Sequence, residues 1–141
     1  MKLTAIVASA LVFAGGGLAH AQQSSAPANA KAYIISPTDG ETVSNPFKVV
    51  FGLSGMGVAP AGTDAENTGH HHLLIDISPD DLDFTETLPA DDNVRHFGGG
   101  QTEVEIELEP GEHTLQLLLG DMNHVPHDNP VMSDVVNITV E

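Results

Sequence analysis

Histidine is the residue type in this chain whose number and spacing could do chemistry. The chain has 141 residues and eight histidines, and five of these are spaced so that a folded chain could gather them: His70, His72, His96, His124 and His127. Imidazole is the commonest protein ligand for transition metals, and it titrates near neutral pH. The sequence therefore indicates a site that holds a metal ion or senses a proton.

The triplet that follows Gly69 carries the clearest spacing signal. In an extended strand alternate side chains share a face, so His70 and His72 point the same way with Cα atoms about 6 to 7 Å apart, close enough to chelate one ion. His71 points to the opposite face with apolar neighbours, and we expect it to be a hydrogen-bonded core residue. Two more imidazoles, His124 and His127, lie on a proline-stiffened loop, which loses little entropy on binding.

The kinds of ligand available narrow the choice of metal. The chain has no cysteine, so a metal must be held by nitrogen, oxygen or thioether. Met56 and Met122 lie close to the histidine motifs, and imidazole with thioether favours copper in either oxidation state. Either methionine could instead be a packing residue. Zinc or nickel would suit a histidine site joined by a nearby carboxylate, for which the candidates are Asp76, Asp121 and Asp128.

The beginning of the chain resembles an export signal. Lys2 precedes an almost wholly apolar run over 3–18, and Ala19-His20-Ala21 places small residues where a signal peptidase cuts. We predict a signal peptide over 1–21 and a periplasmic or secreted protein; a cut after Ala19, leaving His20 first, is the alternative. Residues 22–30 are predicted to be a flexible lead-in with nothing to bury, and 31–141 one domain.

The net charge of the chain limits the kinds of molecule that it can bind. Twenty acidic residues against four basic ones give a formal net charge of −16. Such a chain repels nucleic acid and anionic lipid and attracts cations. No apolar stretch after the signal is long enough to cross a bilayer, so we expect no membrane insertion once the signal is removed. A metal ion is the expected partner, and a homodimer or an envelope protein remains open.

The residue pattern of the domain predicts short strands separated by Gly, Pro, Asn and Asp, and it shows no sustained helical periodicity. The predicted strands are 32–36, 47–54, 70–78, 102–109, 113–120 and 134–140. We predict an all-β, immunoglobulin-like two-sheet Greek-key sandwich of six to eight short strands. Strict alternation over 103–109 makes that strand the clearest, and the turn at 109–112 is predicted to join it to the next as an antiparallel pair.

This topology would gather the histidines. Strands of such a sandwich alternate in direction, so the loops 55–69 and 121–133 and the turn entering Thr102 should meet at one end. The acidic segment between 79 and 93 is too long for a hairpin loop, and it is predicted to be either an edge strand or a flap. If it is a flap, its apolar side chains would cover Leu74 and Leu118, which a dimer interface could cover equally well.

Catalysis is not indicated. The acidic pairs lie in a solvated loop, and no nucleophile-elbow motif is present, so we expect no enzyme. A structural or adhesive envelope domain, whose histidines form a buried hydrogen-bond network, remains the alternative to metal binding. A third hypothesis for the same histidines is a pH-sensitive surface, whose clustered imidazoles become positively charged on mild acidification.

Four motifs carry a family resemblance. They are Gly-Met-Gly-Val-Ala-Pro-Ala-Gly over 55–62, Gly-His-His-His-Leu-Leu-Ile-Asp over 69–76, His-Phe-Gly-Gly-Gly-Gln-Thr-Glu over 96–103, and the loop 120–133. Across 33–140 the chain closely resembles the exported bacterial family called domain of unknown function 4399, a resemblance that implies no activity. The fold also is similar to that of small periplasmic copper carriers. Those commonly use an N-terminal histidine, whereas the favoured cut leaves Gln22 first.

Overall fold

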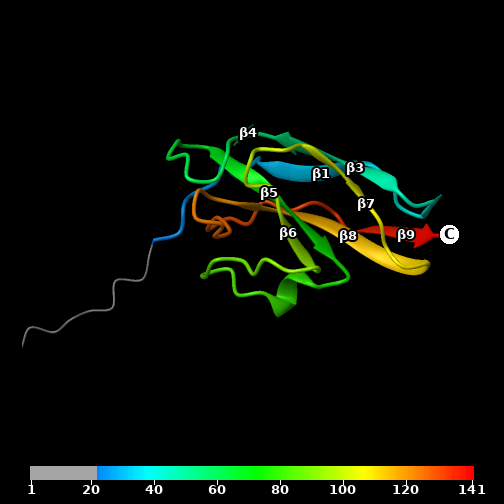
Figure 1. Cartoon of the computed structure of the whole chain (residues 1–141). Helices are drawn as coiled ribbons and strands as arrows, with labels where there is room; N and C mark the ends of the chain where they lie inside the picture. Colours follow the sequence, from blue (N-terminus) through cyan, green and yellow to red (C-terminus); the bar gives the residue numbers. More distant parts are fainter. Residues whose placement is uncertain (1–21) are drawn as a thin grey trace, which may run out of the picture.

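The computed structural model describes residues 22–141, so the predicted signal peptide 1–21 lies outside the described residues. The regular secondary structure of the described chain is β-strand, apart from one short 3₁₀ turn, η1, at Pro79–Asp81 (Figure 1). The strands are β1 Lys31–Ser36, β2 Glu41–Val43, β3 Phe47–Ser54, β4 Gly57–Val58, β5 Thr68–Ile75, β6 Val94–His96, β7 Glu103–Ile106, β8 Gly111–Gly120 and β9 Val136–Val140. Among these residues no helix has the length and apolar character that crossing a membrane requires.

The strands form two sheets, which confirms the predicted immunoglobulin-like sandwich. One sheet has the order β1-β3-β7, and the other has the order β2-β9-β8-β5-β4, with β6 paired to β5. Six of the strands have four or more residues, and they correspond to the six predicted from sequence. The three additional strands, β2, β4 and β6, have two or three residues each, too few for an alternation pattern to be visible.

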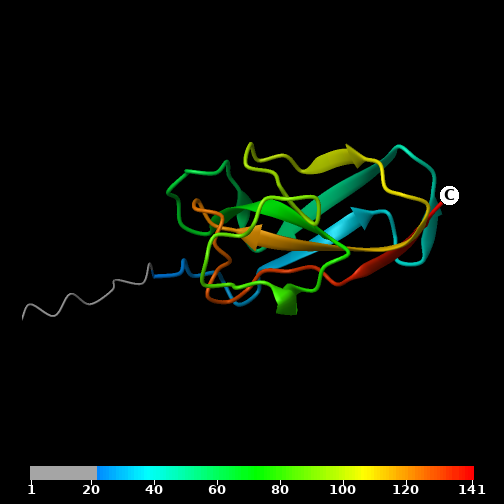
Figure 2. The same cartoon turned by 60° about the horizontal axis from the view of Figure 1, so that its bottom comes forward.

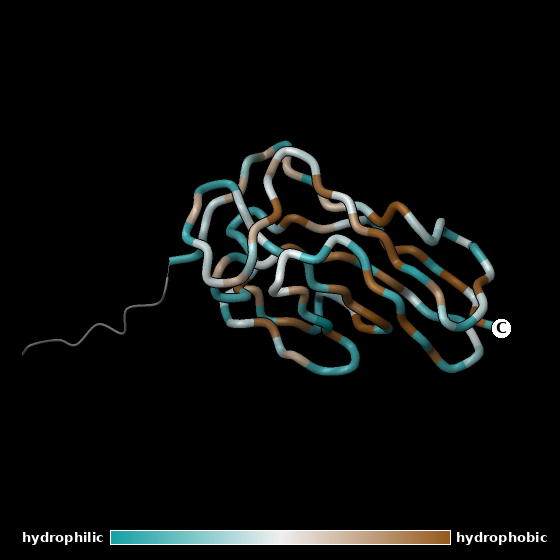
Figure 3. The backbone as a smooth tube through the Cα atoms, turned by 45° about the horizontal axis from the view of Figure 1, so that its top comes forward, coloured by the Kyte–Doolittle hydropathy of each residue, from teal (hydrophilic) through white to brown (hydrophobic). Residues whose placement is uncertain are grey.

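The main core lies between the two sheets. Alternate side chains of β3, β5 and β8 supply it, because in a strand every second residue faces the same side. Its central members are Phe47, Val49, Phe51, Leu73, Ile75, Leu115, Leu117 and Leu119. Figure 3 shows the hydrophobic stretches along the strands and the hydrophilic ones in the connecting loops.

The predicted pairing around the turn at 109–112 is wrong. Strand β7 pairs with β3, whereas β8 pairs with β5 and β9, so the chain between Ile106 and Gly111 crosses from one sheet to the other. Alternation over 103–109 reports that one face is buried, but it carries no information about which strand lies alongside.

The acidic segment between 79 and 93 is a flap, one of the two predicted possibilities. It lies over the outer face of the six-stranded sheet (Figure 2). Leu88, only 2% exposed, packs there with Leu74 and Leu118 in a second apolar cluster, and Leu82 and Phe84 border it. The cluster buries the two outward-facing leucines that the sequence left without a partner.

The segment 22–30 makes contacts that the sequence did not predict. Two of its three alanines, Ala26 and Ala30, pack against the main core, and Ser24 Oγ donates to Asp121 Oδ2 at 2.8 Å. The amide nitrogen Nε2 of Gln23 donates to the carbonyl oxygens of Phe84 and Pro126, at 2.6 and 3.1 Å. Composition alone could not indicate this docking, because its polar partners lie 61 to 103 residues away in sequence.

Candidate metal centre

Strand β5 positions the first two imidazoles. It runs beside β8, with His70 opposite Gly120 and His72 opposite Leu118, and β6 pairs with its other edge. Because β5 has strands on both sides and a flap over its outer face, His70 and His72 are both 0% exposed. Their side chains share the outer face, as predicted, and their ring centroids lie 4.7 Å apart.

The third imidazole comes from the loop after β8. Asp121 Oδ1 accepts the backbone N–H groups of Asn123 and Val125, and the Asp121 carbonyl accepts that of His124 at 3.0 Å. This tight turn holds His124 at a φ of 63°, a left-handed conformation that non-glycine residues rarely adopt. From the flap, Leu88 N–H donates to the His124 carbonyl at 2.9 Å. The turn and the flap together fix the direction of the His124 side chain.

The three rings converge on one point. His124 Nδ1 lies 2.9 Å from His70 Nε2 and 3.2 Å from His72 Nε2. A suitable nitrogen from each ring lies within 4.8 Å of the other two. One N–H on His124 Nδ1, or one lone pair there, cannot make two well-aligned hydrogen bonds. At least one of the two facing nitrogens, His70 Nε2 or His72 Nε2, is therefore left without a well-aligned hydrogen bond, and a metal ion bound by all three rings would remove that conflict.

Gly120 makes room for this group. A Cβ atom at position 120 would lie 2.4 Å from His72 Cε1 and 3.3 Å from the His124 backbone, so only glycine fits without displacing an imidazole. Sequence reasoning did not identify Gly120 as a site residue. In the sequence Gly120 is visible only as a glycine at the end of a predicted strand. Glycine occurs at strand ends for many other reasons, so this position alone does not indicate a site.

Burial keeps the group uncharged. Desolvation lowers the pKa of His70 to about 4 and that of His72 to about 2, and the neighbouring imidazoles add to both shifts. Desolvation also lowers the pKa of His124, together with the charge of His96. Near neutral pH these rings are therefore neutral, the protonation state in which imidazole binds metals.

His96 lies beside the three converging rings. Its ring stacks on His124 with centroids 4.6 Å apart, and it lies 4.4 Å from the His72 ring. Its Nε2 is 2.7 Å from the Pro89 carbonyl, so that nitrogen carries the proton and donates to the flap. His96 is outside the group of three nitrogens within mutual reach, and it packs against that group instead.

The other candidates lie farther out. His127 is 1% exposed and also outside the group of three; it lines a cavity with Ser24, Glu66 and Asp121. Met56 packs against the main core, and Met122 is 36% exposed. The structure thus brings His70, His72 and His124 together with His96 against them, but it does not bring His127 into the same group.

His71 faces the core as predicted and packs on Phe51, with ring centroids 5.2 Å apart. The expected hydrogen bonds are absent, because neither of its ring nitrogens has a partner. The apolar side chains of the main core surround this position and offer no polar group. Burial accordingly lowers the pKa of His71 to about 4.

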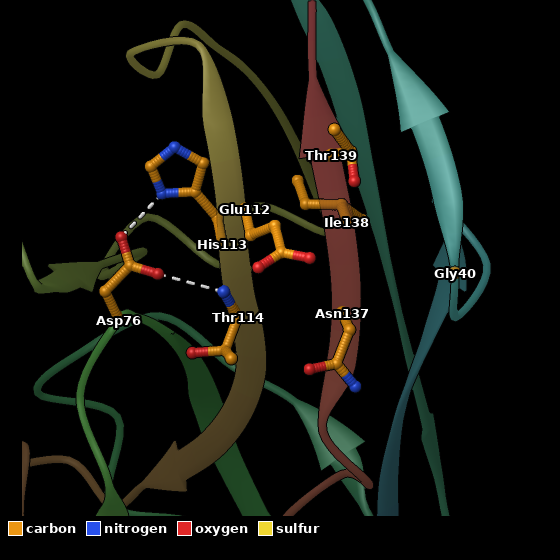
Figure 4. A pocket seen from close by; sticks show the side chains of 8 residues that line it. All are labelled: Gly40, Asp76, Glu112, His113, Thr114, Asn137, Ile138 and Thr139. Carbon is orange, nitrogen blue, oxygen red and sulfur yellow. Dashed lines mark hydrogen bonds and ion pairs between the residues drawn. The ribbon is translucent and has the colours of Figure 1, made fainter.

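His113 lies near the start of β8, at the end of the strand opposite to Gly120, and its ring faces Asp76 (Figure 4). Its Nδ1 is 2.6 Å from Asp76 Oδ2 and its Nε2 is 2.7 Å from the Glu109 carbonyl. Two acceptors require a proton on both nitrogens, and the hydrogen bond to Asp76 raises the pKa of His113. Asp76 is thus engaged away from the three imidazoles, and Asp128 binds Ser25. Of the three carboxylates considered as additional ligands, Asp121 alone accompanies the group.

The family model described as Domain of unknown function (DUF4399) matches residues 49–141, which include all four histidines of the cluster. No curated protein and no solved structure matches the chain.

Proposed function

The chain belongs to the DUF4399 family, and we propose that this domain binds a transition-metal ion, copper in the first place, through His70, His72 and His124. The observation that carries the proposal is the convergence of three buried imidazole nitrogens within 4.8 Å of one another. Among divalent first-row ions, nitrogen ligands bind copper most tightly. Zinc and nickel are the next candidates.

The rival function is structural, with the histidines forming a buried network that stiffens one end of an envelope domain. Such a network is useful when its members satisfy one another. Here His124 Nδ1 would have to pair with both His70 Nε2 and His72 Nε2, at 2.9 and 3.2 Å, which one proton or one lone pair cannot do with good alignment, so the rings are not arranged for mutual satisfaction. This observation favours metal binding over the network.

We infer a binding role and not a catalytic one, in an exported domain that captures or carries the ion. The three ligands are neutral, and the surrounding chain is strongly acidic, which favours cation capture. The export signal predicted over 1–21 would take the domain to the periplasm or outside the cell, where metal ions enter.

Metal analysis and thermal melting test the proposal. The untagged protein is expected to bind copper at one equivalent, and an ion at 100 times its dissociation constant should stabilise the fold by about 2.7 kcal/mol. The His70→Ala/His72→Ala double variant and His124→Ala should lose this stabilisation. His127→Gln is the matched control, a buried histidine on the same loop outside the group, and it should keep it. Unchanged melting of the wild-type protein with copper, zinc and nickel would overturn the proposal.

A further inference from the structure

Asp121 is a buried charge without a cationic partner. It is 6% exposed, and no other acidic residue in the described part of the chain is buried. Its carboxylate accepts three hydrogen bonds, all from neutral donors: the backbone N–H groups of Asn123 and Val125, and the hydroxyl of Ser24. The ion pairs found within 22–141 involve other carboxylates. A buried carboxylate is costly unless a positive charge compensates it.

The carboxylate lies next to the three converging imidazoles. Asp121 directly follows Gly120, which contacts His72 and pairs with His70, and its carbonyl binds the His124 amide. Asp121 and His124 also line one cavity together. Burial lowers the pKa of His70 and of His124, and the negative charge of Asp121 opposes that shift in both.

We propose that Asp121 is the built-in counter-ion of the metal centre and determines which ionic charge the centre prefers. This inference rests on the proposed metal-binding function. Three neutral imidazoles leave the whole charge of the ion uncompensated in a buried place, where an uncompensated charge is most costly. Asp121 compensates one unit of that charge, and because its attraction is proportional to the charge of the ion, it shifts the preference of the centre toward divalent ions relative to cuprous ion. Asp121 is thus a specificity-determining residue that need not touch the metal.

The Asp121→Asn variant removes the negative charge of the side chain and keeps its size and shape. The amide oxygen can accept the same two backbone N–H groups, and the Ser24 hydroxyl can rotate to accept from the amide nitrogen. The attraction between Asp121 and the ion is proportional to the charge of the ion. We therefore expect the loss of divalent affinity to be twice the monovalent loss on a logarithmic scale: if cuprous affinity falls about tenfold, zinc affinity should fall about a hundredfold.

The experiment measures cuprous and zinc affinities by chelator competition, with cuprous ion handled without oxygen. Asp128→Asn is the matched control, because Asp128 lies on the same loop and also accepts a serine hydroxyl, from Ser25, but is exposed. We expect it to change both affinities little and equally. Asp121→Ser provides a second neutral side chain that can still accept a backbone N–H.

The outcomes separate the two proposals. Wild-type protein that binds neither ion overturns the metal-binding function itself. Wild-type binding with equal losses for both ions in Asp121→Asn, or with no loss, overturns the counter-ion role while leaving the function intact. Unfolding of both neutral variants without metal would assign Asp121 to the loop structure alone and would also overturn the counter-ion role.

Discussion

The imidazole of His71 is buried between the sheets with neither nitrogen hydrogen-bonded. An unpartnered buried polar group costs about 1–3 kcal/mol, and replacing it by an apolar side chain removes that cost. We expect His71→Leu to raise the free energy of unfolding by about 1 kcal/mol. Denaturant unfolding near neutral pH measures the change, and metal affinity should be unaltered because His71 faces away from the centre. A loss of stability would show that His71 has a partner in solution.

The buried histidines make the metal-free protein sensitive to acid. His70 and His71 have a pKa of about 4 when folded, against 6.5 when free, so the unfolded chain takes up protons first as the pH falls. Their stabilisation is complete above about pH 6.5 and declines between there and about pH 4. Each contributes up to about 1.4 kcal/mol per pH unit. His113 acts oppositely: its pKa is raised, so its stabilisation is present below 6.5 and is lost as the pH rises through the folded value.

Unfolding free energies of the metal-free protein at about pH 7.5, 6.5 and 5.5 test this dependence. The His71→Leu variant is the internal control, because it should lose the contribution of one histidine to the slope below pH 6.5. An identical slope in the variant would contradict the assignment.

Gly120 tests the packing of the centre from the backbone side. In Gly120→Ala the new methyl group meets the His72 ring, so the ring must shift from the position in which it faces His124. We expect at least a tenfold loss of metal affinity, the lower end of about 10- to 100-fold losses for residues that orient ligands. Isothermal titration measures the affinity. Gly57→Ala is the control, because Gly57 is also a strand glycine without a positive φ and its added Cβ would meet Thr68 Cγ2 only at 3.8 Å, an ordinary contact.

At the scale of elements, the flap over 79–93 is coupled to the centre through two consecutive residues. Leu88 N–H holds the His124 carbonyl, and the Pro89 carbonyl accepts from His96. Leu88→Ala should destabilise the fold by about 2–4 kcal/mol through the cavity it leaves, and metal affinity should fall as well. Leu82→Ala, on the same flap but only bordering the cluster, should cost less stability and leave the affinity unchanged. Equal effects on affinity would show that the flap acts only as a cover.

The strands show how much of the fold could be predicted from the sequence. Alternation and turn residues were enough to predict the six longer strands and the facing of His70, His72 and Leu74. The partner of β7 could not be predicted, because a period of two reports burial and not neighbours. The short strands β2, β4 and β6 could not be predicted either, since their pairing depends on the sheet edge that the rest of the fold presents.

The candidate centre was partly predictable for the same reason. Strand direction predicted that the triplet and the loop after β8 would meet, and His70, His72 and His124 do meet. His127 faces elsewhere because the turn at Asp121 sets the direction of each side chain in that loop, and a loop conformation has no period to read. The hydrogen bonds of Ser24 and Gln23 to this region required the folded structure.

At the scale of the whole molecule, net charge should govern how fast ions arrive. The chain carries a formal charge of −16, and a negative field concentrates cations near the surface. We expect the association rate of zinc to fall several-fold between about 10 mM and 150 mM salt, because the screening length shortens from about 30 Å to about 8 Å. Stopped-flow measurements of binding and release test this, and the release rate should change little. A salt-independent association rate would contradict the role of the field.

The alternation along β5 restricts how this domain can change in length. Adding or deleting one residue between Thr68 and Ile75 would exchange the two faces of the strand beyond that point, turning His71 outward and carrying leucines to the wrong side. The exposed stretch over 63–67 has no such alternation, so it can gain or lose residues without exchanging the faces of β5. Divergence in length should therefore accumulate before the triplet and be rejected within it.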